Sequence, residues 1–291
     1  MLTQVLDALR DRDMALIEAD TDGVYFAVPV FWTEEQERQL VAEIGAQLPA
    51  GIHLEYEGRY RAMFSHEVKN YALLTYDGQL IVHGVALRSS RAEPFGERFL
   101  RRALSCTMTG DVVEVHDTYL QTAEALRQRT FPASDVAARV RLSKSPEVYQ
   151  ARRVGHAEQA YETLLAAGRT RWTPGERVRF YRAVGGASVW IPDESEEISF
   201  DETGKADARA GEHERKEPLL PDHNHDVQNR HDYDVDHYLR VLVTSYASRL
   251  RKAYAAEDFE QLFRIDEQLG LFDRSIEDIQ PIWIRCQATG T

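Results

Sequence analysis

The spacing of apolar residues changes near Pro94, and this change limits the possible folds more than any other feature. Before it, residues 52–89 alternate apolar and polar side chains, with the turn sequence Asp77-Gly78 inside the run, as is typical of antiparallel strands. After it, apolar residues recur every three or four positions in several segments, as is typical of helices. The sequence therefore predicts an α+β fold, in which a small antiparallel sheet with flanking helices is followed by a mainly helical part.

Two short apolar runs, Ala15–Ala19 and Val24–Val28, flank an Asp-Thr-Asp-Gly segment at 20–23, which predicts a strand hairpin. In an extended chain Asp20 and Asp22 point to the same face. Two carboxylates held together in this way favour a divalent cation such as Mg²⁺. An Asp-rich turn is the simpler interpretation, because aspartate tolerates turn conformations. The spacing alone leaves both interpretations open.

The chain has 291 residues, enough for one large or two ordinary domains. Its two cysteines, Cys106 and Cys286, form neither a disulfide framework nor a metal motif, which fits a reducing cytoplasm. No apolar run approaches the roughly 18 residues that span a membrane. We therefore expect a cytoplasmic protein with no membrane partner.

The net charge of −13 is unevenly distributed. Residues 96–192 carry 15 Lys and Arg against 10 Asp and Glu, whereas residues 193–237 carry 5 against 15. Local charge matters more than total charge for binding a phosphate backbone. The basic middle of the chain is therefore compatible with a nucleic-acid partner.

Beyond the spacing, the Asp-Thr-Asp-Gly segment resembles the metal-binding Asp-Thr-Asp-Ser hairpin of family B DNA polymerases of the bacterial and archaeal type. Other segments between about residues 15 and 260 resemble motifs of that family in the same order. They are LEYEGRY with Glu57, the Lys-x-Tyr motif of Lys69 and Tyr71, Gly84 followed by the basic Arg88 and Arg91, the thumb sequence that opens at LSKSP with Ser143 and Lys144, and the helix start DVDHYLRVLV. The set resembles the C-terminal portion of such a polymerase.

The resemblance implies a palm portion at residues 1–93 and a thumb at residues 94–291, the latter with a flexible acidic insert at about 193–232. Asp20 and Asp22 would be catalytic metal ligands for two Mg²⁺ or Mn²⁺ ions. The partners would be primer–template DNA and a deoxynucleoside triphosphate, in replication or repair. DNA-binding residues would be Lys69, Tyr71, Arg88, Arg91, Ser143 and Lys144, and supporting residues would be Thr21, Glu57 and Gly84.

The sequence also departs from the family pattern. Gly23 stands where the family has Ser, His83 stands where it has Lys, and Ser89-Ser90-Arg91 replaces its Arg-Arg-Asp. The metal-ligand motif DxxSLYP and the nucleotide-binding motif KxxxNSxYG do not occur. We therefore expect part of a nucleotidyltransferase that needs an upstream half and is inactive alone. The alternative is a non-catalytic DNA-binding module derived from a polymerase.

Two further groups of residues have competing interpretations. Arg98, Arg101 and Arg102 share one helix face, where they could neutralise phosphates or simply contact solvent. The run HNHDVQNRHDYDVDH, residues 223–237, has the residue types of a metal hydrolase but lacks an apolar scaffold to fix ligands. A solvated loop is the simpler interpretation of that run.

Overall fold

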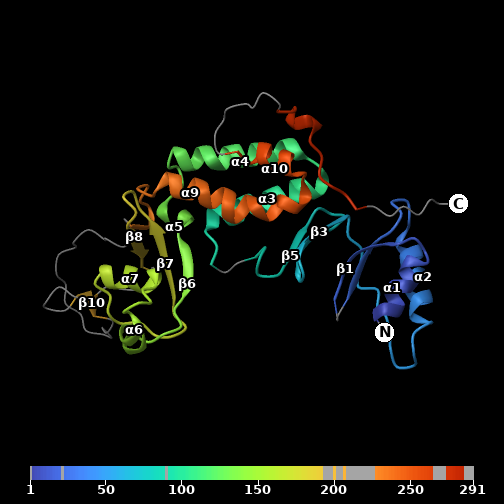
Figure 1. Cartoon of the computed structure of the whole chain (residues 1–291), viewed down its shortest axis with the longest axis horizontal. Coiled ribbons are helices and arrows are strands. Elements are labelled where there is room, and N and C mark those ends of the chain that lie inside the picture. Colours follow the sequence, from blue (N-terminus) through green and yellow to red (C-terminus); the bar gives the residue numbers. More distant parts are fainter. Residues whose placement is uncertain are drawn as a thin grey trace.

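The computed structural model describes residues 2–20, 23–88, 91–192, 227–264 and 273–284, with the backbone of two short strands at 199–200 and 206–207. In Figure 1 the chain forms an arch. The N-terminal helices and first hairpin form one end, and a second small sheet with two helices forms the other. Longer helices cross the top. The predicted α+β class is confirmed.

The N-terminal end contains α1 (Leu2–Arg10), β1 (Ala15–Ala19), β2 (Val24–Ala27) and α2 (Glu34–Gly45). Strands β1 and β2 pair antiparallel, as the apolar runs predict. Helix α2 begins with a capping box, in which the Thr33 side chain accepts from the backbone N–H of Gln36 and the Gln36 side chain accepts from that of Thr33. Residues from α1 and α2, including Leu9, Leu40 and Ile44, form a small core of their own.

The next sheet has the order β3-β4-β5 and is antiparallel, with β3 at Ala62–Glu67, β4 at Asn70–Leu74 and β5 at Leu80–His83. The turn at Asp77-Gly78 joins β4 to β5 as predicted. The alternation in residues 52–60 also predicts a strand, and this prediction is wrong, because the segment forms no strand. Its side chains pack on α2 instead: the Tyr56 hydroxyl donates to the Glu37 carboxylate at 2.6 Å.

A helical layer crosses the top of the arch (Figure 1). It consists of α3 (Pro94–Thr109), α4 (Val112–Arg127), α5 (Ala133–Val136), α9 (Val235–Val241), a π-helical turn (Leu242–Tyr246), a 3₁₀ stretch (Ala247–Ala253), α10 (Ala256–Leu262) and a 3₁₀ turn (Ile276–Asp278). The main core joins this layer to the β3–β5 sheet, since Phe64 and Leu74 belong to the same cluster as Phe99 and Leu104. Core packing therefore crosses the predicted palm–thumb boundary at residue 93.

The other end of the arch contains β6 (Ala138–Arg141), α6 (Pro146–Arg152), α7 (Gln159–Ala166), β7 (Arg177–Arg182) and β8 (Ser188–Ile191). Its antiparallel sheet has the order β6-β7-β8. The helical pattern over residues 146–168 predicts continuous helix, but the structure has two helices there. A separate core lies under the sheet and includes stacked Tyr149 and Tyr161, with Trp172 beside them. We refer to residues 138–192 as the β6–β8 unit.

The predicted acidic insert at about 193–232 lies largely outside the described residues. Within it, β9 (Ser199–Phe200) and β10 (Ala206–Asp207) pair antiparallel. No helix in the described ranges is long and apolar enough to cross a membrane.

Candidate functional site

The β1–β2 hairpin positions the first of the two predicted metal ligands. Asp20 directly follows β1, and its backbone N–H donates to the carbonyl of Gly23 at 2.9 Å, which closes the hairpin. The Asp20 side chain is 28% exposed, so its carboxylate remains accessible at the surface. The other predicted ligand, Asp22, and the supporting Thr21 lie outside the described residues.

Glu18 attaches this hairpin to the neighbouring sheet. One carboxylate oxygen accepts from the Ser65 hydroxyl at 2.8 Å, and the other accepts from the backbone N–H of Lys69 at 3.1 Å. The Glu18 carboxylate is therefore engaged in orienting the hairpin. The sequence does not indicate this role, because both hydrogen bonds reach residues far away along the chain.

Lys69 contacts Asp20 from the turn between β3 and β4. Its ammonium lies 3.1 Å from a carboxylate oxygen of Asp20. The sequence predicts that Lys69 and Tyr71 lie on one strand, and this prediction is wrong for Lys69. Residues 68–69 form the turn itself, and Lys69 has a φ of 62°. In that left-handed conformation, the backbone N–H of Lys69 donates to Glu18 and its side chain pairs with Asp20.

Tyr71 lies on β4, opposite Ser65 on β3 and His83 on β5. Its hydroxyl lies 3.1 Å from that of Tyr25 on β2, and its ring stacks on His83 with 4.7 Å between ring centroids. Burial and the hydrogen bond with Tyr71 raise the pKa of Tyr25 well above its ordinary value. The two tyrosines form a second bridge between the hairpin and the sheet.

Gly84 is required by a close approach of two backbone segments. It has a φ of +83°, and a Cβ atom there would lie 2.3 Å from both the Lys69 carbonyl oxygen and the side-chain oxygen of Asn70. The same Asn70 oxygen accepts from the backbone N–H of Ala86 at 2.8 Å, and the Asn70 amide donates to the Val68 carbonyl at 2.9 Å. Asn70, which the sequence analysis did not single out, thus fixes the loop that follows β5.

Three other predicted palm residues, Arg88, Glu57 and Arg91, are exposed. Arg88 is exposed in the loop after Gly84. Glu57 is exposed in the segment that forms no strand, close enough to Tyr25 for its charge to contribute to the raised pKa. Arg91 is also exposed, and its backbone carbonyl accepts from the N–H of Arg139 at 3.4 Å.

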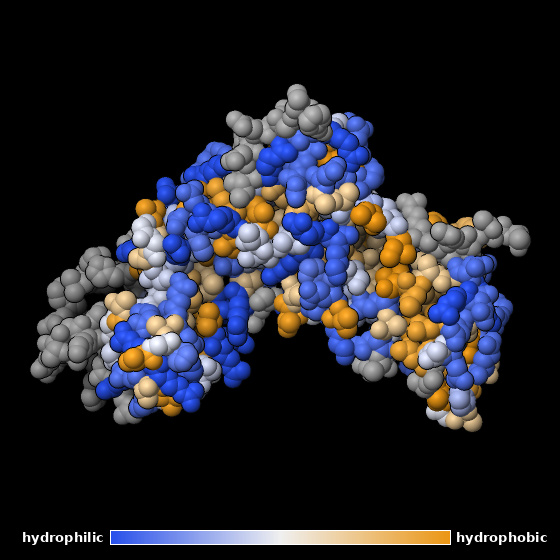
Figure 2. Space-filling model, viewed as in Figure 1, coloured by the Kyte–Doolittle hydropathy of each residue, from blue (hydrophilic) through white to orange (hydrophobic). Residues whose placement is uncertain are grey.

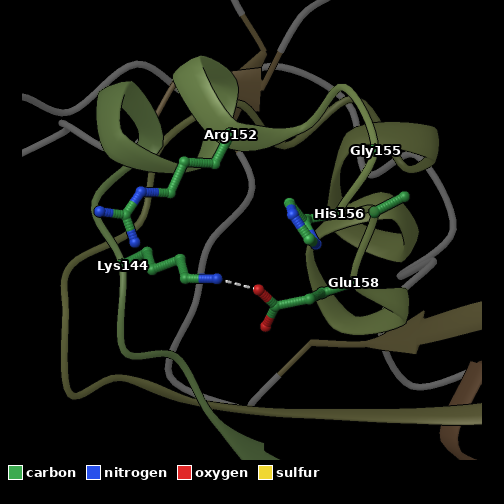
Figure 3. A pocket seen from close by; sticks show the side chains of 6 residues that line it. Lys144, Arg152, Gly155, His156 and Glu158 are labelled. Carbon is green, nitrogen blue, oxygen red and sulfur yellow. Dashed lines mark hydrogen bonds and ion pairs between the residues drawn. The ribbon is translucent and has the colours of Figure 1, made fainter.

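The predicted thumb residues Ser143 and Lys144 lie between β6 and α6, two elements at the far end of the arch from this hairpin (Figure 1). Both of their backbone N–H groups donate to the Tyr161 hydroxyl at 2.9 Å. The Lys144 ammonium pairs with Glu158 across an open cavity of about 550 Å³, into which Arg152 and His156 also project (Figure 3). The buried aromatic cluster thus holds the LSKSP loop in place.

Two of the three helical arginines discussed from the sequence pair with acids of the chain. Arg98 pairs with Asp135 and Arg102 pairs with Glu114. In the His- and Asp-rich run, His223 and His225 lie outside the described residues, while His231 contacts the Arg129 carbonyl at 2.6 Å. Within the described ranges, no group of three or more His, Cys, Asp or Glu side chains is placed to hold a metal.

Comparison with known proteins adds to this geometry. No protein-family model matches the chain. A DNA polymerase of Pyrococcus horikoshii is 23% identical over 268 residues, which are 90% of this chain and 19% of that relative. A DNA polymerase of Thermococcus gorgonarius is 22% identical over 260 residues, which are 88% of this chain and 30% of that relative. The chain therefore spans less than a third of the length of these relatives.

Among solved structures, the family B DNA polymerase from Pyrobaculum calidifontis matches 94% of this chain and 29% of its own, with a TM-score of 0.55 and 16% identity. The sequence and structural comparisons agree in covering most of this chain and a minor part of each relative. The predicted resemblance is confirmed: the chain is similar over most of its length to archaeal DNA polymerases and has the fold of part of a family B DNA polymerase.

Proposed function

We propose that this chain forms part of a DNA-directed DNA polymerase, in which it binds primer–template DNA and supplies Asp20 and Asp22 to a metal site for nucleotidyl transfer. The main support is the convergence of Asp20, Lys69, Tyr71 and Gly84. These residues come from three separate motifs of the resemblance, yet they meet beside the turn end of one hairpin. A chance match of short motifs would not bring them together.

The residues present fit a divalent cation. Carboxylate oxygens are the ligands that Mg²⁺ and Mn²⁺ prefer, and the Asp20 carboxylate is partly exposed beside the Lys69 ammonium. Asp20 and Asp22 would hold the ions, which in such sites activate the primer 3′-hydroxyl and neutralise charge on the nucleotide phosphates. Lys69 balances the charge of Asp20 before metal and substrate arrive.

The chain's own residues would position DNA on both sides of that site. In this proposal Lys69, Tyr71 and Arg88 contact the primer–template near the primer end. Ser143 and Lys144 contact the duplex further along. Since Lys144 is paired with Glu158, its binding to a phosphate would exchange one anionic partner for another. Arg91, near the junction with β6, would contact the same duplex.

The site would be completed by residues outside these 291. The motifs DxxSLYP and KxxxNSxYG do not occur in the sequence, so another metal ligand and the nucleotide-binding helix must come from elsewhere, in the same or a separate polypeptide. We propose that this upstream half is the chain's main protein partner. The chain alone would bind DNA without extending a primer.

Primer extension by a reconstituted complex tests the proposal. The chain is mixed with a polypeptide that carries the two missing motifs, and extension of a labelled primer is measured with Mg²⁺ and nucleotides. We expect extension only in the mixture, and a loss of at least about 100-fold with Asp22→Asn, because removing a charge-stabilising group costs roughly that much. The matched control is Asp11→Asn at the exposed end of α1, which should leave extension unchanged.

The alternative, a non-catalytic DNA-binding module, predicts another result. It is supported if DNA binds to the chain but no extension occurs in the mixture, or if extension is insensitive to Asp22→Asn. Either outcome would contradict the catalytic proposal.

A further inference from the structure

Two acids of the first hairpin bind the two ends of the same lysine. Glu18 on β1 accepts from the backbone N–H of Lys69, and Asp20, just after β1, pairs with the Lys69 ammonium. The second carboxylate oxygen of Glu18 accepts from the Ser65 hydroxyl on β3. Both oxygens of Glu18 therefore bind the chain itself, and one of them holds the residue whose side chain occupies Asp20.

The backbone is irregular at each group that meets Glu18. Strand β1 contains an extra residue, Ile17, directly before Glu18, and β3 contains one, His66, directly after Ser65. Bulges of this kind redirect neighbouring side chains and are common next to active sites. Lys69 adds a positive φ of 62°, which is strained for a residue with a side chain. Three departures from regular backbone thus converge on one carboxylate.

The Lys69–Asp20 pair depends on this hold on the backbone. The Lys69 side chain is 63% exposed, and exposed ion pairs contribute little by themselves, because fixing a long side chain costs rotamer entropy. Holding the Lys69 backbone limits how far its ammonium can move from Asp20. The Lys69 carbonyl is confined as well, since it lies where a Cβ atom on Gly84 would clash.

Asp20 can be reached from the hollow of the arch. Strand β1 is the element of the N-terminal end nearest that hollow (Figure 1), and Figure 2 shows the hollow open between this end and the β6–β8 unit. The Asp20 side chain is 28% exposed. A divalent cation from solution can therefore meet this carboxylate directly, and Lys69 is a competing cation supplied by the chain.

From these observations we infer that Glu18 is a positioning residue of the hairpin. Together with Ser65 it holds the turn at Lys69, so that the ammonium stays on Asp20 and lowers the affinity of the hairpin for a divalent cation. Glu18 acts through Lys69 and is not itself a metal ligand. The use of Asp20 as a metal ligand rests on the proposed function, whereas the hold on Lys69 does not.

The first measurement follows the Lys69 backbone amide without metal. Hydrogen exchange of the whole chain is recorded by NMR in EDTA. In Glu18→Ala the Lys69 amide should exchange at least about ten-fold faster, because a hydrogen bond to a charged group is lost. Exchange in α3 and α4 should not change, which shows that the variant is folded. The matched control is Glu67→Ala, which removes an exposed acid at the end of β3 and should leave Lys69 unchanged. Unchanged exchange of Lys69 in Glu18→Ala would overturn the inference.

The second measurement asks whether the hold on Lys69 alters metal affinity. Binding of Mn²⁺ is measured by electron paramagnetic resonance of the free ion for the unmodified chain, Ser65→Ala, Lys69→Met and the two substitutions combined. Ser65→Ala leaves the charge of the hairpin unchanged, and it should tighten binding about two-fold, because part of a weak exposed ion pair is lost. In the Lys69→Met background it should have no effect, so the two substitutions are coupled.

A merely structural role gives another pattern. Ser65→Ala would then weaken Mn²⁺ binding in both backgrounds, and this result would overturn the inference. Equal affinity of all four chains, including the absence of binding to any of them, would also overturn it. Ser65→Thr keeps the hydroxyl and should restore the affinity of the unmodified chain.

These measurements separate the inference from the proposed function, because neither requires primer extension. Coupling between Ser65 and Lys69 without extension in the reconstituted complex would defeat only the catalytic proposal. Extension that depends on Asp22, together with no coupling, would defeat only the positioning role of Glu18.

Discussion

At the scale of single residues, Lys69 links the predicted metal site to the predicted DNA contacts. Its ammonium lies 3.1 Å from Asp20, and its backbone N–H is held by Glu18. A divalent ion that binds Asp20 must therefore compete with a cation supplied by the chain. The left-handed turn at Lys69 fixes this arrangement, and Gly84 makes room for it.

Replacing Lys69 should therefore strengthen metal binding. In Lys69→Met no ammonium has to be displaced from Asp20, and an exposed ion pair is worth about 0.2–1 kcal/mol. We expect Mn²⁺ to bind two- to five-fold more tightly to this variant in a calorimetric titration. Lys144→Met is the matched control, since Lys144 is also paired with an acid but lies between β6 and α6, away from Asp20. Weaker binding to Lys69→Met would indicate that Lys69 helps to assemble the metal site.

The residues of this cluster differ in how far the sequence could predict them. Asp20, Lys69, Tyr71 and Gly84 were predicted because they stand in recognisable motifs. Glu18 was not assigned a role, because its two hydrogen bonds reach residues about fifty positions away. From the sequence alone, an acidic residue on a strand that makes such a contact cannot be distinguished from one that is exposed to solvent.

At the scale of elements, the hydrophobic period and the turn residues predicted structure correctly where the contacts were local. The β1–β2 hairpin and the Asp77-Gly78 turn both formed as predicted. Residues 52–60 alternate like a strand, yet Tyr56 and Arg59 both bind Glu37 on α2. Alternation describes an extended chain, and whether that chain gains a pairing partner depends on tertiary packing.

The helical layer offers a test at this scale, at the contact between α3 and the π-helical turn. A Cβ atom on Gly96 would lie 2.1 Å from ring atoms of Tyr246, whose hydroxyl also donates to the Glu93 carboxylate at 2.5 Å. Gly96→Ala should therefore destabilise the protein by about 1–3 kcal/mol through overpacking, measured by chemical denaturation. Gly45→Ala in α2 is the control, because its Cβ would meet Leu54 at an ordinary 3.6 Å and alanine favours helix by about 1 kcal/mol. An unchanged or raised stability for Gly96→Ala would contradict the close packing of these helices.

At the scale of the whole molecule, the described residues form three separate hydrophobic cores. The largest joins the β3–β5 sheet to the helical layer, and two smaller cores lie at the ends. The sequence predicted a division between palm and thumb at residue 93, where the change of period is clear. It could not predict that Phe64 and Phe99 would share a core, because periodicity identifies a buried face but not what covers it.

Because the cores are separate, we expect the ends of the arch to unfold locally before its centre does. Local stability follows buried apolar contacts, so backbone amides of α1 and α2 should exchange with solvent sooner than those of α3 and α4. Leu9→Ala, in the N-terminal core, should accelerate exchange only in α1, α2 and the β1–β2 hairpin. Leu104→Ala, in the main core, should cost about 2–5 kcal/mol and accelerate exchange throughout, because both ends are attached to that core. Uniform exchange along the unmodified chain, or a global effect of Leu9→Ala, would instead show that the arch unfolds as a single cooperative unit.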